Sequence, residues 1–230
     1  MEKSILLKEY KEREARIKQR LNDFKRFYSE NVSWFYVNGE MHLLPSKKHD
    51  NERIFEELCF CILTANTSAV IGMKAVDALR DVIEQGGIED ISLKLRESGY
   101  RFPNIRARFI FEARQKFMTQ YGMNLKGIIE SFSNIEQARD FFANEVKGLG
   151  YKEASHFLRN IGVFGFAILD KHILRTMHEF GLIEDVPKSL TKKRYLEIEK
   201  KLFDFSNKIG IPIDELDLLL WSMKTGKIMK

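Results

Sequence analysis

Between residues 10 and 28, apolar side chains recur at three- and four-residue steps, with Lys, Arg and Glu between them. This spacing gathers them on one face of a helix, because an α-helix turns once in 3.6 residues. The sequence therefore predicts an amphipathic N-terminal helix whose apolar face carries Tyr10, Ile17, Leu21, Phe24 and Tyr28.

The pattern changes in VSWFYVNGEMHLLP, where Asn38-Gly39 separates two apolar runs. Asn-Gly is a preferred pair in a two-residue type I′ turn, because both of its central residues need a positive φ. We therefore expect a short β-ribbon at this point.

From Ile54 onward the pattern is helical almost throughout, without a linker or an internal repeat. FEELCFCILTAN is apolar on all sides, which is typical of a buried helix. One helix is predicted over SAVIGMKAVDALRDVIEQGG, ending at its two glycines, and another after Pro103. Further helices are expected over 125–132, 135–146, 152–161, 170–180, 192–207 and 212–224. The pattern predicts an all-α unit, bilobed in outline.

Composition agrees with a folded, helical chain. Its 230 residues are 44% hydrophobic and include only 4 prolines and 14 glycines, which argues against disorder and against a turn-rich β fold. The 2 cysteines cannot form a disulfide scaffold or supply the four thiolates of an iron–sulfur cluster. Cys59 and Cys61 point to different faces of an apolar helix, so we interpret them as buried small residues and expect no metal site.

Residues 1–20 are charged throughout, and no apolar run is long enough to span a membrane. These features predict a soluble, cytoplasmic protein. The net charge of +5 does not identify a partner by itself, since many proteins without a nucleic-acid partner carry as much.

The tight turn Gly148-Leu149-Gly150 separates two predicted helices. Two glycines around one apolar residue let the backbone turn sharply, while Leu149 anchors the turn inward. Such a turn presents backbone N–H groups and a helix N-terminus, which together can bind a phosphate without reading sequence. The alternative is an ordinary connection between two helices.

Lys152 lies in the first turn of the second helix, where the helix dipole disfavours a cation by roughly 0.3–1 kcal/mol. A structural lysine gains nothing there, whereas a nucleophilic lysine needs its neutral form. Asp170 follows the apolar run FAIL and precedes the next amphipathic helix, so it occupies an N-cap position where backbone N–H groups stabilise a carboxylate. A carboxylate near a neutral amine can stabilise a developing oxocarbenium ion, although a plain N-cap explains Asp170 equally well.

The GLGYK segment, the loop up to Asp170 and the run Asp-Lys-His resemble the helix–hairpin–helix DNA glycosylases of base-excision repair. The similarity is greatest to the small prokaryotic (type 2) branch of the 8-oxoguanine DNA glycosylase/AP lyases. It covers most of the chain, including ILTANTSA and the C-terminal LLLWSMKTGKIMK. The loop before the aspartate usually holds a proline in that family, but residues 162–169 contain none.

This resemblance implies an all-α, bilobed fold with the active site in a cleft between two helical subdomains. The first lobe would comprise residues 1–65 and 180–230, and the second residues 66–179, with the hairpin at about 140–162. It also implies a monomer that acts on double-stranded DNA containing 8-oxoguanine, without a cofactor or a catalytic metal.

The resemblance further implies roles for single residues. Lys152 would attack C1′ of the damaged nucleotide and form a Schiff base, and Asp170 would stabilise the sugar cation. Gly148 and Gly150 would hold the DNA backbone. His172 would bind a phosphate beside the flipped nucleotide, unless it is an ordinary core or surface histidine. Asn66 would fill the gap left by the base, or else cap a helix.

Base recognition would fall mainly to the C-terminal tail. Trp221 would stack on the flipped purine, unless its ring belongs to the core. Lys230, which would otherwise be a solvated end, would help to recognise 8-oxoguanine. Phe102 is a candidate for the other wall of the pocket, and His156, one turn after the lysine on the same helix face, would line it.

Three alternatives remain open on the sequence. An endonuclease III-type glycosylase would remove oxidised pyrimidines, but most of those proteins carry four clustered cysteines near the C-terminus. A monofunctional alkylbase glycosylase would lack the lysine nucleophile. A non-catalytic helix–hairpin–helix DNA-binding module would need neither Lys152 nor Asp170.

Overall fold

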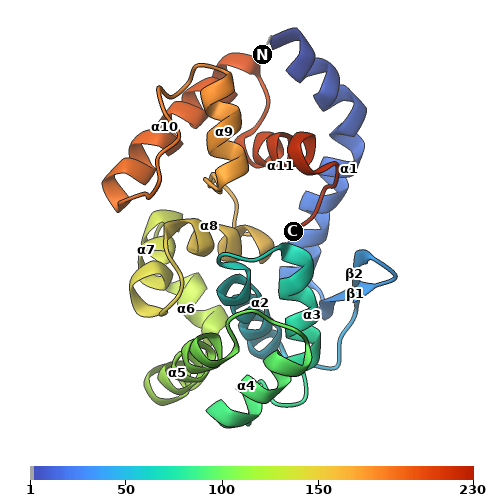
Figure 1. Ribbon diagram of the computed structural model, residues 1–230, viewed down its shortest axis with the longest axis vertical. Coiled ribbons are helices and arrows are strands. Elements are labelled where there is room, and N and C mark those ends of the chain that lie inside the picture. Colours follow the sequence, from blue (N-terminus) through green and yellow to red (C-terminus); the bar gives the residue numbers. More distant parts are fainter. Residues whose placement is uncertain (1–2) are drawn as a thin grey trace.

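The computed structural model describes residues 3–230, which form eleven helices and one two-stranded sheet (Figure 1). The N-terminal elements are α1 (Lys3–Ser29), β1 (Val32–Val37), β2 (Glu40–Pro45), α2 (Asp50–Thr64), α3 (Ala69–Leu79) and α4 (Ile88–Glu97). They are followed by α5 (Pro103–Tyr121), α6 (Leu125–Ser131), α7 (Ile135–Glu145), α8 (Tyr151–Asn160), α9 (Lys171–Glu179), α10 (Lys192–Ile209) and α11 (Ile213–Thr225). The predicted all-α class is confirmed.

The helices form two lobes, one above the other in Figure 1. In the central lobe, α2 packs against α3, α5, α6 and α8. In the terminal lobe, α11 packs against α1, α9 and α10. The far end of α1 reaches α8 and β1, so this long helix contacts both lobes.

The contacts of two helices favour a division into lobes that differs from the one expected on the sequence. α2 is apolar on all sides and therefore packs at the centre of the central lobe instead of joining the N-terminal segment. α9 turns its buried face, with Ile173, Leu174 and Met177, toward α11. On these contacts we propose that the lobes are α2–α8 on one side, and α1 with α9–α11 on the other.

The prediction of one continuous helix over SAVIGMKAVDALRDVIEQGG is wrong for the second half of this segment. α3 ends at Leu79, turns follow, and a separate helix α4 begins after Gly87. The Arg114 guanidinium from α5 donates to the carbonyls of Ile83 and Gly86. A side chain distant in sequence thus satisfies carbonyls that a continued helix would bond internally.

The predicted β-ribbon is confirmed. β1 and β2 pair antiparallel with Val37 opposite Glu40. Asn38 and Gly39 both have a positive φ, 51° and 87°, as a type I′ turn requires.

The two lobes share one connected hydrophobic core. Cys59 and Cys61 on α2 are fully buried in it, which confirms their interpretation as small core residues. Burial raises the pKa of both thiols well above the ordinary value, so neither is a reactive thiolate. Within residues 3–230, none of the helices combines the length and hydrophobicity of a membrane span.

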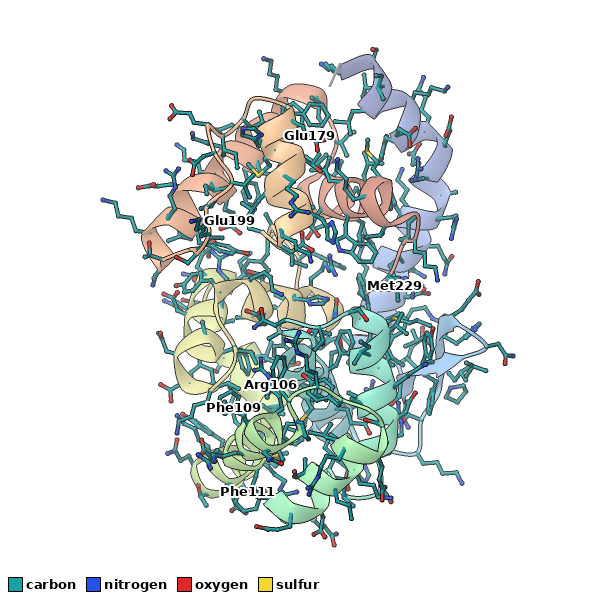
Figure 2. All side chains as sticks on the ribbon, in the orientation of Figure 1. Arg106, Phe109, Phe111, Glu179, Glu199 and Met229 are labelled. Carbon is teal, nitrogen blue, oxygen red and sulfur yellow. The ribbon has the colours of Figure 1, made fainter. Side chains whose placement is uncertain are left out.

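The extended segment 163–169 joins α8 to α9 and is held by carboxylates from the terminal lobe. Glu199 of α10, labelled in Figure 2, accepts from the N–H of Ala167 at 3.1 Å. Asp217 of α11 accepts from the N–H of Ile168 at 2.8 Å. The same two carboxylates bind Arg139 and Arg159 of the central lobe, each at 2.7 Å.

Tyr195 completes this support from within the core. Its hydroxyl donates to the carbonyl of Ala167 at 2.5 Å and accepts from the N–H of Leu169 at 3.3 Å. The segment therefore has a fixed path without the family's usual proline, because side chains satisfy its backbone groups.

Replacing Tyr195 with Phe tests this support. We expect the free energy of unfolding to fall by about 1–3 kcal/mol, because the change leaves buried backbone groups without partners. Denaturant titration measures it. Tyr36→Phe on β1 is the control, since its hydroxyl makes none of the hydrogen bonds found within residues 3–230. Equal losses of unfolding free energy in the two variants would show that the Tyr195 hydroxyl does not support the segment 163–169.

Candidate active site

An open cleft of about 820 Å³ lies between the lobes. Its walls come from the α2–α3 loop, one side of α8, the start of α9, the segment 186–190, and α11 with the residues after it. The volume is within the range of small-ligand sites and is large enough for one nucleotide. Seven of the ten residues singled out from the sequence line it: Asn66, Lys152, His156, Asp170, His172, Trp221 and Lys230.

Lys152 enters the cleft from the first turn of α8. Its side chain is 26% exposed, and its Nζ lies 2.9 Å from Oε1 of Glu153. The side chain therefore combines partial access to solvent with a carboxylate partner from the same turn of α8.

Asp170 enters the cleft from the start of α9, in the other lobe. It is the N-cap of that helix, as predicted, and its Oδ1 accepts from the N–H groups of His172 at 2.7 Å and Ile173 at 2.8 Å. Oδ2 makes none of the hydrogen bonds found within residues 3–230. The cap therefore uses one oxygen, and the other can face a bound molecule.

The glycine turn lies outside the residues that line the cleft. Gly148 has a φ of +88°, a conformation that strongly favours glycine. A Cβ there would lie 2.6 Å from the Phe109 ring and 2.9 Å from Arg106, both on α5 (Figure 2). Leu149 is 4% exposed and anchors the turn, as expected. Gly150 is the N-cap of α8 and is exposed.

Asn66 follows the end of α2 with a φ of +64°, so it occupies the left-handed position that commonly ends a helix. Its side chain is exposed and lines the cleft. Neighbouring carbonyls are held by other side chains: Leu63 O accepts from the Tyr100 hydroxyl at 2.6 Å, and Ala65 O from Arg106 at 3.1 Å. Asn66 thus lies at a helix end, and its exposed side chain lines the cleft; its entry into the gap left by a base stays a prediction.

Trp221, on α11, is half-buried and lines the cleft, so its ring is neither wholly core nor free in solvent. His172 lies in the first turn of α9 and is also half-buried. Phe102 does not line the cleft in this structure. It precedes α5 as its N-cap and packs under the Arg101 guanidinium, 4.9 Å from the ring centre. Its expected place in the pocket wall therefore stays a prediction.

The Lys230 side chain is buried away from solvent, contrary to the expectation for a chain end. Its Nζ pairs with Glu57 of α2 and lies 3.9 Å from the centre of the Phe60 ring. Its backbone is hydrogen-bonded to His156. Because the ammonium is committed to Glu57, only the main chain and the adjacent stem of Lys230 can face the cleft.

His156 packs edge-on against Phe60, with ring centres 5.7 Å apart. Burial lowers the pKa of His156 well below the ordinary value, and the charges of Arg159, Lys152 and Lys230 act in the same direction. The imidazole is therefore neutral at physiological pH.

Sequence reasoning missed three features of the site. The first is Glu153, which contacts Lys152. A glutamate three residues after an N-cap is the capping-box pattern, so the sequence did hold a signal for it. Arg106 supports both the glycine turn and the Asn66 loop from α5. The segment 186–190 lines one wall, but it has no periodicity that could have indicated this. Within residues 3–230, no group of three or more His, Cys, Asp or Glu side chains is arranged to hold a metal ion.

Comparison with known proteins shows the family to which this chain is similar. The sequence model of a family described as 8-oxoguanine DNA glycosylase matches residues 40–211. The 8-oxoguanine DNA glycosylase/AP lyase of Methanocaldococcus jannaschii is 44% identical over 184 residues, which cover 80% of this chain and 86% of that protein. The protein of the same name from Fusobacterium nucleatum is 37% identical over 225 residues, or 96% of this chain and 94% of that protein.

The fold of this chain is also similar to that of a solved structure. The crystal structure of the M. jannaschii 8-oxoguanine glycosylase/lyase in complex with a 15mer DNA containing 8-oxoguanine superposes with a TM-score of 0.82. The alignment covers 98% of this chain and 100% of that chain at 37% identity. The fold is thus that of the helix–hairpin–helix DNA glycosylases. Within that class, the chain belongs to the 8-oxoguanine DNA glycosylase family.

Replacing Gly148 with Ala tests the fit of the turn. We expect a loss in unfolding free energy of about 1–2 kcal/mol from the positive φ, and about 1–3 kcal/mol more from the clash with Phe109 and Arg106. Gly210→Ala is the control, because Gly210 has a φ of +76° but nothing within 4 Å of an added Cβ. Denaturant titrations that give equal losses would show that the turn is not tightly packed.

The neutral His156 predicts a dependence of stability on pH. Below about pH 6.5, His156 takes up a proton in the unfolded chain but stays neutral in the folded protein. The free energy of unfolding should therefore decrease as the pH is lowered, by up to about 1.4 kcal/mol per pH unit. His156→Gln should remove this part of the slope, as measured by denaturant titration at about pH 7.5 and about pH 5.5. An unchanged slope in the variant would contradict the prediction.

Proposed function

We propose that this protein removes 8-oxoguanine from double-stranded DNA and then cleaves the strand at the abasic (AP) site that remains. The observation that carries the proposal is the pairing of Lys152 and Asp170 in one cleft, each at the start of a helix from a different lobe. The names of the M. jannaschii and F. nucleatum relatives support the same substrate and both activities.

The chemistry follows from the positions of the two side chains. C1′ cannot be reached inside a stacked duplex, so the damaged nucleotide must be extruded into the cleft. The neutral amine of Lys152 attacks C1′ as the glycosidic bond breaks, and the adduct becomes a Schiff base that permits β-elimination on the 3′ side. Asp170, whose Oδ2 is left over from the helix cap, stabilises the positive charge that develops on the sugar.

The DNA backbone is held by groups around the cleft. The turn at Gly148 and Gly150 offers the N-terminus of α8 to a phosphate, while its own Leu149 and Gly150 N–H groups are bonded to Val146 O and Glu153. His172 binds a second phosphate from the first turn of α9. Asn66, exposed at the end of α2, enters the gap left by the extruded base.

The base itself meets Trp221 and the C-terminal segment. A half-buried indole can stack on a purine, which contributes about 1–3 kcal/mol in nucleic-acid complexes. His156 is neutral and bonded to the Lys230 backbone, so it holds that backbone at the cleft wall without adding charge. Phe102 would have to move from its place at the start of α5 to form the second wall.

We further propose that the protein acts as a monomer on the chromosome in the cytoplasm. All the groups named above come from one chain, so no second copy is needed to complete the site.

Borohydride reduction of a Schiff base tests the reaction directly. In the presence of a duplex containing 8-oxoguanine, the wild-type protein should form a covalent protein–DNA adduct, visible on a denaturing gel. Lys152→Gln should abolish the adduct, while duplex binding changes little, because phosphate contacts provide most of the affinity. Lys193→Gln is the matched control, since Lys193 occupies the second position of α10, as Lys152 does in α8.

Other outcomes identify the alternatives. Excision without an adduct would exclude the lyase step. An adduct formed only with oxidised pyrimidines would indicate an endonuclease III-type enzyme, and binding without any excision would indicate a non-catalytic module.

A further inference from the structure

Glu153 connects the predicted nucleophile to the turn before it. Its Oε1 lies 2.9 Å from Nζ of Lys152, and its Oε2 accepts from the N–H of Gly150 at 3.3 Å. One carboxylate thus contacts both the amine in the cleft and the backbone of the glycine turn. Its side chain is 15% exposed and lines the cleft.

This contact is unusual for adjacent residues on a helix, whose side chains point about 100° apart and do not normally meet. It arises because Glu153 is the third residue of α8 and folds back toward the N-cap, where a carboxylate satisfies an unpaired N–H group. The backbone therefore fixes the carboxylate beside the amine, and little side-chain entropy is lost when the two interact.

Lysine must lose a proton before its lone pair can attack carbon. Besides Lys152, and Lys230 whose ammonium is paired with Glu57, the charged and titratable residues of the cleft wall are Glu153, Asp170, Asp217, His156, His172, Arg159, Lys171 and Lys188. Within residues 3–230, Glu153 is the only carboxylate in ion-pair contact with Lys152. Asp217 is occupied by Arg159 at 2.7 Å, and Asp170 caps α9. Burial makes His156 a poor acceptor, because it lowers the pKa of the imidazole.

We propose that Glu153 is a catalytic residue that accepts the proton of Lys152 and so generates the nucleophile. This inference rests on the proposed function. The N–H bond breaks as an O–H bond forms on Oε1 of Glu153. The freed lone pair then bonds to C1′, and the electron pair of the C1′–N9 bond leaves with the base, which is protonated by water.

The contact with Gly150 gives the acceptor a second role. The same turn that is expected to bind phosphate also orients the carboxylate, so a correctly seated backbone fixes the geometry of the proton transfer. Glutamine at position 153 keeps an oxygen for the Gly150 N–H but cannot take a proton at neutral pH, which separates the two roles.

The experiment is single-turnover borohydride trapping with Glu153→Gln between about pH 6 and about pH 10. It uses two duplexes, one with 8-oxoguanine and one with a preformed abasic site. We expect the variant to be slower by on the order of 10²-fold at neutral pH on both duplexes. Its rate should recover as the pH rises, because hydroxide then removes the proton. Glu153→Asp, which retains a carboxylate, should keep the wild-type pH profile at a lower rate.

Glu52→Gln is the matched control. Glu52 occupies the same third position of α2 and accepts from the N–H of His49 at 2.8 Å, but it does not line the cleft. Its trapping rates should equal those of the wild type. Unfolding titrations on both variants will separate loss of the helix cap from loss of the proton acceptor.

Two results would overturn the proposal. A Glu153→Gln rate and pH profile equal to the wild type would show that Glu153 takes no part. A rate lowered equally at every pH would make it a positioning residue only. Absence of an adduct from the wild-type protein on both duplexes would instead overturn the proposed function, and this inference with it.

Discussion

Two buried carboxylates fix the relation between the lobes. Glu199 and Asp217 each bind an arginine of the central lobe and a backbone N–H of the segment that leads to Asp170. Burial raises the pKa of Asp217, while the Arg159 guanidinium and the Ile168 N–H act in the opposite direction. Buried ion pairs contribute little net stability, because desolvation is costly. They do fix geometry, since separating these helices would leave a buried carboxylate and a buried guanidinium unpaired.

That geometry brings two helix N-termini to one cleft. Lys152 lies in the first turn of α8 and Asp170 is the N-cap of α9, so the two side chains enter the cleft from two helix starts. The relative position of Lys152 and Asp170 in the cleft depends on the segment 163–169, because this segment joins α8 to Asp170.

The C-terminal segment also makes contacts in both lobes. Lys230 follows α11 of the terminal lobe, yet its ammonium is paired with Glu57 at the centre of the central lobe. Glu57 also accepts from Asn160 at the end of α8, at 2.7 Å. The end of the helix that carries Lys152 and the C-terminal segment that lines the cleft thus share one buried carboxylate.

The sequence by itself determined the helical class, the β-ribbon at Asn38-Gly39 and the N-cap at Asp170, because periodicity and turn chemistry are local properties. Most of the residues that its motifs selected also line the cleft. Only the tertiary structure decided which helices α2 and α9 pack against, where α3 ends, and that Lys230 is paired with Glu57. These depend on contacts between residues far apart in the chain, such as Arg114 with the carbonyls of Ile83 and Gly86, and no local pattern encodes them.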